Sequence, residues 1–194
     1  MPLMRNGLVD ETFDFPRMPI SVIAVGDVGE AFLVRSVLEG LGASVLFHLI
    51  GTPNDFLRAL GQGEAASRYV VICAHGDENG FVFGDYGAGI NIASLTDGSM
   101  PPESIADHVN LPSRVVVSTA CGSGSEAFAA AFLKGGVSVY IAPNDSPEGS
   151  DAGLVIHMLF HQIMGRGASP ETALARVHAY DSALKPFVAF RAPK

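Results

Sequence analysis

Two apolar stretches decide how this chain folds: YVVICAHG at residues 69–76 and RVVVSTACGSGS at residues 114–125. In each stretch a run of mostly β-branched residues ends abruptly at a short polar or glycine-containing segment. Runs that are apolar at every position are typical of strands buried on both faces, as in a parallel sheet covered by helices. We therefore predict two central strands, one with His75 and the other with Cys121 just beyond its carboxyl end.

The rest of the chain alternates short apolar runs with helical patterns, which predicts one α/β domain. We expect further strands at residues 20–25, 44–50 and 137–142, and helices over residues 30–41, 54–60, 123–135 and 150–164, with others opening at residues 101 and 169. Glycines around the runs FVF and INIASL favour a small hairpin within residues 80–95.

This order of elements predicts a three-layer sandwich in which helices cover both faces of a mostly parallel central sheet. If the five strands are numbered along the chain, the expected order in the sheet is 2-1-3-4-5, as in flavodoxin-like folds. We interpret residues 20–194 as the domain and residues 1–19 as an N-terminal arm.

The composition excludes several classes of function. Apolar residues make up 48% of the 194 positions and charged residues 16%, which favours a packed globule over a disordered chain. The net charge of -8 and the lack of a basic block argue against a nucleic-acid partner. No apolar run approaches the roughly 20 residues of a membrane span, so no membrane partner is expected.

Cellular location and cofactors follow from similarly simple observations. The N-terminus lacks the apolar core of a signal peptide, and two cysteines are too few for a disulfide scaffold, so we expect a reducing cytoplasm. The segment GDVGEAF at residues 26–32 lacks the glycine spacing of a dinucleotide loop, and no cofactor is expected. His157 and His161 share a helix face without a third ligand, so no metal site is expected.

Polar side chains follow four of the predicted strands: Asp27, His75, Cys121 and Asp145. The carboxyl ends of parallel strands meet at one edge of the sheet, where ligands bind in open α/β folds. If the strands before His75 and Cys121 are neighbours, the two side chains open into one cleft. A histidine beside a cysteine supplies the proton transfer that acyl chemistry requires.

The predicted helix after Cys121 adds to this hypothesis. A helix that begins near Ser123 directs backbone N–H groups toward the thiol, which favours the thiolate. Gly76 has no side chain, so its N–H can approach a substrate carbonyl. The alternative is that Cys121 is a packing residue, since cysteine is among the most often buried residue types. Cys73 lies within an apolar strand and is assigned to the core.

From the first decisive stretch onward, the chain resembles the caspase-like cysteine peptidases, the clan that includes caspases, legumain, gingipains and CHAT domains. The matching features are the His-Gly pair in YVVICAHG and the Ala-Cys pair in RVVVSTACGSGS. The later segments FAAAFLKGGVSVYIAPNDSP and GRGASPETALARV look most like those of a CHAT domain.

The resemblance implies roles for individual residues. Cys121 would be the nucleophile and His75 the general acid/base, with the N–H groups of Gly76 and Cys121 forming the oxyanion hole. Asp27, Thr119 and Asp145 occupy the positions with which clan members select the residue before the cleaved bond (P1). Carboxylates there favour a Lys or Arg side chain.

The leading hypothesis is therefore a cysteine endopeptidase that acts on a peptide or protein substrate. A DJ-1-like cysteine hydrolase is an alternative, although such enzymes place the histidine after the cysteine in the chain. A non-catalytic caspase-like or flavodoxin-like assembly domain is another, and under that interpretation Cys121 is unreactive. The oligomeric state is open, with a homo-oligomer as one option.

Overall fold

The structure is a computed structural model that describes residues 17–26 and 28–192. Its main sheet has six strands in the order β2-β1-β3-β7-β8-β9, and all of its pairings are parallel except β8–β9. The predicted fold class is confirmed, and so is the predicted order of the first five strands. The strands are β1 (Met18–Ala24), β2 (Ala43–Leu49), β3 (Tyr69–Cys73), β7 (Val115–Ser118), β8 (Val139–Pro143) and β9 (Phe187–Arg191).

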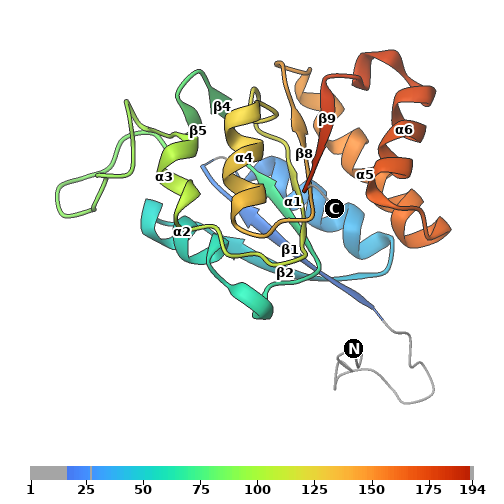
Figure 1. Ribbon diagram of the computed structural model, residues 1–194, viewed down its shortest axis with the longest axis horizontal. Coiled ribbons are helices and arrows are strands. Elements are labelled where there is room, and N and C mark those ends of the chain that lie inside the picture. Colours follow the sequence, from blue (N-terminus) through green and yellow to red (C-terminus); the bar gives the residue numbers. More distant parts are fainter. Residues whose placement is uncertain (1–16, 27, 193–194) are drawn as a thin grey trace.

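Helices cover both faces of this sheet (Figure 1). The helices are α1 (Gly29–Gly40), α2 (Pro53–Leu60), α3 (Pro102–Ala106), α4 (Glu126–Lys134), α5 (Gly149–Arg166) and α6 (Pro170–Tyr180), with 3₁₀ turns at Gly63–Ala65 and Ser182–Leu184. One buried cluster joins the sheet to α1, α5 and α6, and the other joins it to α2, α3 and α4.

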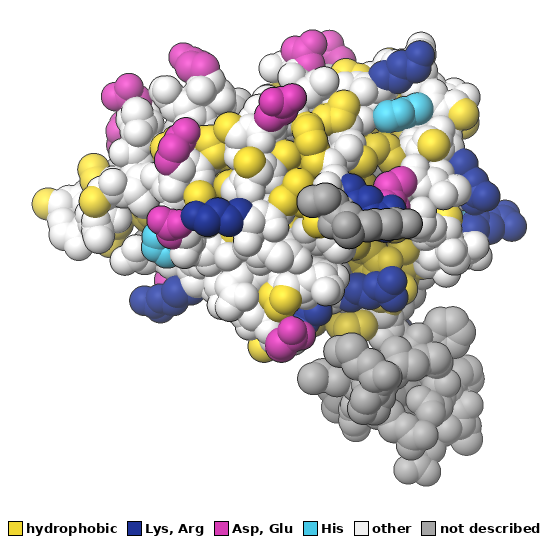
Figure 2. All heavy atoms as spheres, in the orientation of Figure 1, with side chains coloured by type: hydrophobic (Ala, Val, Ile, Leu, Met, Phe, Trp, Pro, Cys, Tyr) yellow, Lys and Arg dark blue, Asp and Glu magenta, His cyan; other side chains and the backbone are white. Residues whose placement is uncertain are grey.

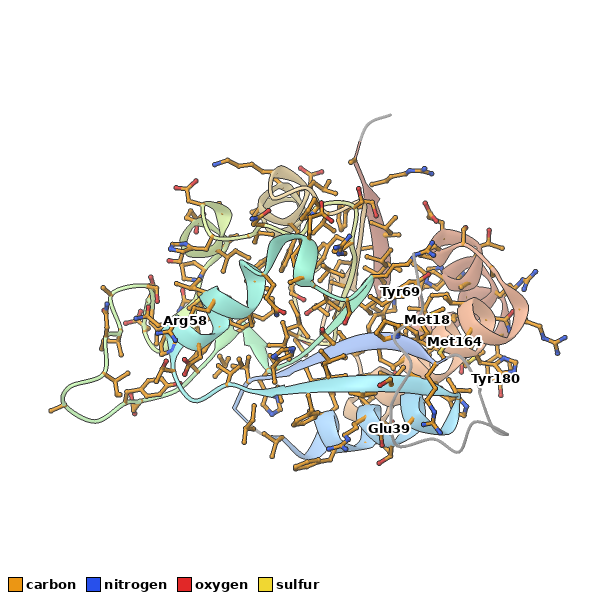
Figure 3. All side chains as sticks on the ribbon, turned by 90° about the horizontal axis from the view of Figure 1, so that it is seen from below. Met18, Glu39, Arg58, Tyr69, Met164 and Tyr180 are labelled. Carbon is orange, nitrogen blue, oxygen red and sulfur yellow. The ribbon has the colours of Figure 1, made fainter. Side chains whose placement is uncertain are left out.

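The fully apolar sequence of β3 follows from its position between these two clusters. Tyr69, Val71 and Cys73 belong to the cluster of α1, α5 and α6, whereas Val70 and Ile72 belong to the opposite one. Successive side chains of a strand point to opposite faces, so a central strand must be apolar throughout. Tyr69 packs edge-on against the ring of Phe160, and Figure 3 shows Met18 beside Tyr69.

Strand β9 was not predicted from the sequence. It pairs antiparallel with β8 at the edge of the sheet, and only Phe187 of its five residues is buried. Its sequence FVAFR contains an apolar run of only four residues, and periodicity alone does not distinguish so short a run from part of a helix. The C-terminal segment therefore closes the sheet beyond the two helices that were expected to end the chain.

The small hairpin predicted within residues 80–95 was placed too late in the chain. The structure forms a three-stranded sheet from β4 (Gly76–Asp77), β5 (Gly80–Val82) and β6 (Ser99–Met100), and much of the intervening chain forms a loop that extends from the body (Figure 1). The side chain of Asp77 explains the early turn, because it accepts hydrogen bonds from the Asn79 and Gly80 N–H groups.

None of the helices in the described part of the chain is long and apolar enough to span a membrane.

Candidate active site

The pairing of β3 with β7 brings His75 and Cys121 to the same point of the sheet edge. The first four residues of β3, Tyr69 to Ile72, each pair with the residue 46 positions later, as Tyr69 does with Val115. The Thr119 N–H donates to the Ile72 carbonyl at 2.9 Å and so extends the pairing beyond β7. The same offset leads from His75 to Cys121. The two residues therefore follow adjacent parallel strands at their carboxyl ends, as predicted.

Direct packing between the two segments supports this placement. A Cβ atom added to Gly76 would lie 2.1 Å from the Cys121 carbonyl oxygen and 3.0 Å from the Cys121 nitrogen. Only a residue without a side chain allows the backbones to approach this closely. The requirement for glycine after His75 therefore comes from contact with the cysteine segment itself.

The turn that carries Cys121 is held by buried hydroxyl groups. The Ser123 hydroxyl donates to the Ala120 carbonyl at 2.7 Å, and the Ser118 hydroxyl lies 2.8 Å from Ser123 Oγ. The Tyr140 hydroxyl, which is fully buried, donates to the Ser123 carbonyl at 2.9 Å. Burial raises the pKa of Tyr140, so its phenol stays protonated as a donor. A network with paired donors and acceptors fixes the turn.

The prediction that a helix begins at Ser123 was wrong. Helix α4 begins at Glu126, and Ser125 caps it by accepting from the Phe128 N–H. Ser123 belongs instead to the turn before the helix, where its hydroxyl donates to the Ala120 carbonyl. Cys121 lies five residues before the first residue of the helix, so it does not belong to the first turn. His75 is then the group that remains to favour a thiolate at Cys121.

Both candidate side chains are accessible to solvent: His75 is exposed and Cys121 partly exposed. The His75 carbonyl accepts from the Val82 N–H at 3.0 Å, which anchors the backbone beside the imidazole. Among the described residues, the Cys121 N–H donates no hydrogen bond to a backbone or side-chain acceptor. The neighbouring Gly122 N–H donates to the Asp145 carbonyl at 3.2 Å. The Cys121 N–H is thus available for a substrate oxygen.

Comparisons with known proteins identify the fold. No protein-family model and no curated protein matches this sequence. Gingipain R, an Arg-specific cysteine proteinase, superposes with a TM-score of 0.56 at 13% identity, covering 90% of this chain and 46% of its own. A chain of the Saccharomyces cerevisiae separase–securin complex also superposes with 0.56, at 14% identity, covering 91% of this chain and 12% of its own.

The chain has the caspase-like fold. It spans less than half of the length of these two neighbours, and an identity of 13–14% shows the fold alone. The finer resemblance to a CHAT domain stays a prediction.

Two of the three predicted substrate-binding residues lie beside Cys121 at the carboxyl edge of this caspase-like sheet. Thr119 is buried and precedes Cys121 by two residues. Asp145 is exposed, and its backbone carbonyl contacts Gly122. The third residue, Asp27, lies outside the described residues.

Sequence reasoning missed Glu30, which the fold brings to the same edge. It lies in the first turn of α1, and its carboxylate accepts a hydrogen bond of 2.5 Å from the Thr119 hydroxyl. The two residues are far apart in sequence, and an acid in the first turn of a helix is an ordinary stabilising feature. Nothing in the sequence pattern distinguished this acid from others.

Cys73 belongs to the core, as predicted. It is fully buried, and burial together with the charge of Glu30 raises the pKa of its thiol far above the usual value. A buried, protonated thiol is a poor nucleophile.

A cavity of about 460 Å³ lies beside the turn that carries Cys121. It lies between the β4–β5 turn, α3 and the start of α4, and Gly122 is part of its wall. Asp77, Glu78 and Glu103 line it, and Phe128 supplies apolar surface. Within the described part of the chain, no three metal-ligating side chains come close enough to hold a metal ion.

Proposed function

We propose that this protein is a cysteine-type endopeptidase with a His75–Cys121 dyad. The observation that carries the proposal is the packing of the His75–Gly76 segment against the backbone of Cys121, at the carboxyl ends of paired strands. This arrangement presents an accessible thiol and an accessible imidazole in one place, in a caspase-like fold.

The proposed reaction uses groups of this chain alone. The Cys121 thiol transfers its proton to His75, and the sulfur attacks the substrate carbonyl to give a tetrahedral oxyanion. The N–H groups of Gly76 and Cys121 stabilise that oxyanion. Imidazolium then donates its proton to the leaving amine as the C–N bond breaks. Water, deprotonated by His75, hydrolyses the resulting thioester and regenerates the thiol.

A basic P1 residue is the proposed specificity. Asp145 lies beside the cysteine turn, and Asp27 and Thr119 complete the set of residues assigned to P1 selection. On the face seen in Figure 2, acidic side chains gather along the upper edge, the side on which the loop after β8 lies in Figure 1. Gingipain R, which shares the fold, is itself Arg-specific. A negative edge attracts cationic substrates and repels an Asp at P1.

Hydrolysis of a fluorogenic peptide panel, varied only at P1, tests the proposal. We expect cleavage after Arg or Lys that is abolished in Cys121→Ala and lowered at least 100-fold in His75→Ala. His157→Ala is the matched control, since this exposed histidine lies on α5 and should leave the rate unchanged. Hydrolysis that persists in Cys121→Ala contradicts the proposal. Inactivity of the folded protein toward every peptide favours the non-catalytic assembly domain instead.

A further inference from the structure

The cavity of about 460 Å³ is built partly by the segments that follow the two candidate catalytic residues. Gly122, which is part of its wall, comes directly after Cys121, and Asp77 comes two residues after His75. The rest of the wall belongs to the β4–β5 turn, to the start of α3 and to the start of α4, which lie together in Figure 1. The cavity is therefore next to the proposed reaction centre.

Hydrogen bonds and close packing set the wall of this cavity. The Asp77 carboxylate accepts from the Asn79 and Gly80 N–H groups at 2.8 and 3.0 Å, and from the Ser99 hydroxyl at 2.7 Å. Gly80 packs directly on β6, because a Cβ added to it would collide with the Met100 carbonyl oxygen. The cavity is thus pre-formed, and its volume lies in the usual range of ligand sites.

Two other carboxylates of the wall are available to a ligand. Glu78 lies in the β4–β5 turn and Glu103 in the first turn of α3; both are exposed, and neither forms a hydrogen bond or an ion pair within the described part of the chain. Phe128, Pro101 and Pro102 add apolar surface to the same cavity. Lys and Arg side chains suit such a site, because their stems are apolar and only their ends are charged.

The position of the cavity indicates which part of a substrate would reach it. The proposed oxyanion donors are the N–H groups of Gly76 and Cys121, so the carbonyl of the cleaved bond lies beside them. Thr119 and Asp145, which are assigned to P1 selection, do not line the cavity, whereas the residues directly after both donors do. A substrate with its P1 side chain against Thr119 and Asp145 leaves the cavity free for the residue after the cleaved bond (P1′).

We propose that this cavity binds a Lys or Arg side chain at P1′ of the substrate, with Glu78 and Glu103 pairing with its charge. The proposal rests on the proposed peptidase function for the meaning of P1′. The stem of the side chain packs on Phe128, and the charged end forms charge-assisted hydrogen bonds with the two carboxylates. Together with a basic P1 residue, this subsite directs cleavage to the bond between two basic residues.

A purely structural role is the alternative for the same acids. Glu103 stabilises the start of α3 as an acid in its first turn, and Glu78 is a solvated turn residue. Such roles predict a small change in melting temperature and no change in the preference between a charged and a neutral P1′ residue. A selectivity ratio therefore distinguishes the two roles, since a loss of stability does not move it.

The catalytic test uses internally quenched peptides with Arg at P1 and either Arg or citrulline at P1′. Citrulline has nearly the same shape as arginine and no charge. We expect the Glu78→Gln/Glu103→Gln double variant to lower the Arg-to-citrulline ratio of kcat/KM roughly 5- to 10-fold, as for the loss of two exposed charge pairs. Glu126→Gln is the matched control, because this exposed acid follows Ser125 of the wall but does not itself line the cavity. An unchanged ratio in the double variant, or an equal fall in Glu126→Gln, overturns the proposal.

Calorimetric binding of argininamide to the Cys121→Ala protein separates this proposal from the peptidase function. Argininamide has the free amine and the side chain of a product that begins with arginine, and its binding needs no catalysis. We expect the double variant at Glu78 and Glu103 to bind it roughly 5- to 10-fold more weakly, and Glu126→Gln and Asp145→Ala to bind it unchanged. This result supports the proposal even if no peptide is cut. The proposal is overturned if argininamide does not bind, if the double variant binds it unchanged, or if Asp145→Ala weakens it equally, whether or not peptides are hydrolysed.

Discussion

Replacement of Gly76 by alanine tests the packing on which the site depends. The added Cβ would lie 2.1 Å from the Cys121 carbonyl oxygen, whereas ordinary contacts begin near 3.4 Å. The obstacle is backbone, which cannot rotate away as a flexible side chain can. The two segments must therefore separate by about an ångström or more, which moves His75 relative to Cys121.

This displacement should lower the stability of the protein modestly and the reactivity of the site strongly. Overpacking in a well-filled site typically costs about 1–3 kcal/mol of folding free energy. For a chain of this length, each kcal/mol lowers the melting temperature by roughly 2–4 °C. A misplacement of about 1 Å between reacting groups costs about 100-fold in rate. We therefore expect a folded Gly76→Ala variant in which the reactivity of the site falls far more than its stability.

The assay is the second-order rate constant for modification of Cys121 by a peptidyl chloromethyl ketone, measured together with thermal unfolding. Gly87→Ala is the matched control, because no atom lies within 4 Å of its added Cβ and its backbone φ is not positive. That variant should match the original protein in both measurements. If Gly76→Ala also matches the original protein in both measurements, close backbone contact at Gly76 does not set the geometry of the site.

Two further predictions concern stability. Tyr140→Phe removes the buried donor to the Ser123 carbonyl and should lower the free energy of unfolding in urea by about 1–3 kcal/mol. Tyr180→Phe is the control, because Tyr180 is 72% exposed, and it should leave the free energy of unfolding nearly unchanged. Equal effects of the two substitutions would contradict the role of the buried hydroxyl. Burial lowers the pKa of His48 below its ordinary 6.5, and among the described residues its Nε2 has no hydrogen-bond partner. The unfolded chain therefore binds the proton more readily, so the contribution of His48 to stability is present above pH 6.5 and is lost as the pH falls below it. His48→Leu should flatten this part of the profile of melting temperature against pH, and an unchanged profile would rule out His48 as the cause.

The strand pattern allowed most of the sheet to be predicted, because central parallel strands must be apolar at every position. The edge strand β9 escaped prediction, since its apolar run of four residues is too short to be distinguished from part of a helix by periodicity. The start of α4 was misplaced for a different reason. Ser123 and Ser125 are equally good capping residues by type. The local hydrogen bond of Ser123 to Ala120 and its tertiary contact with Tyr140 assign it to the turn.

The candidate site was predictable only where its residues follow strands. His75 and Cys121 could be placed together because parallel strands end at one edge of a sheet. Glu30 could not, because its position depends on how α1 crosses the end of β3 to reach Thr119. Contacts of this kind between distant helix and strand residues leave no periodic signal in the sequence.

We propose that His75 and Cys121 act together on a peptide bond. The most direct measurement is site-resolved mass spectrometry after treatment with a peptidyl chloromethyl ketone that carries Arg at P1. We expect modification at Cys121, none at the buried Cys73, and at least a 100-fold slower reaction in His75→Ala. Modification of His75→Ala at the original rate, or modification at Cys73 instead of Cys121, would contradict it.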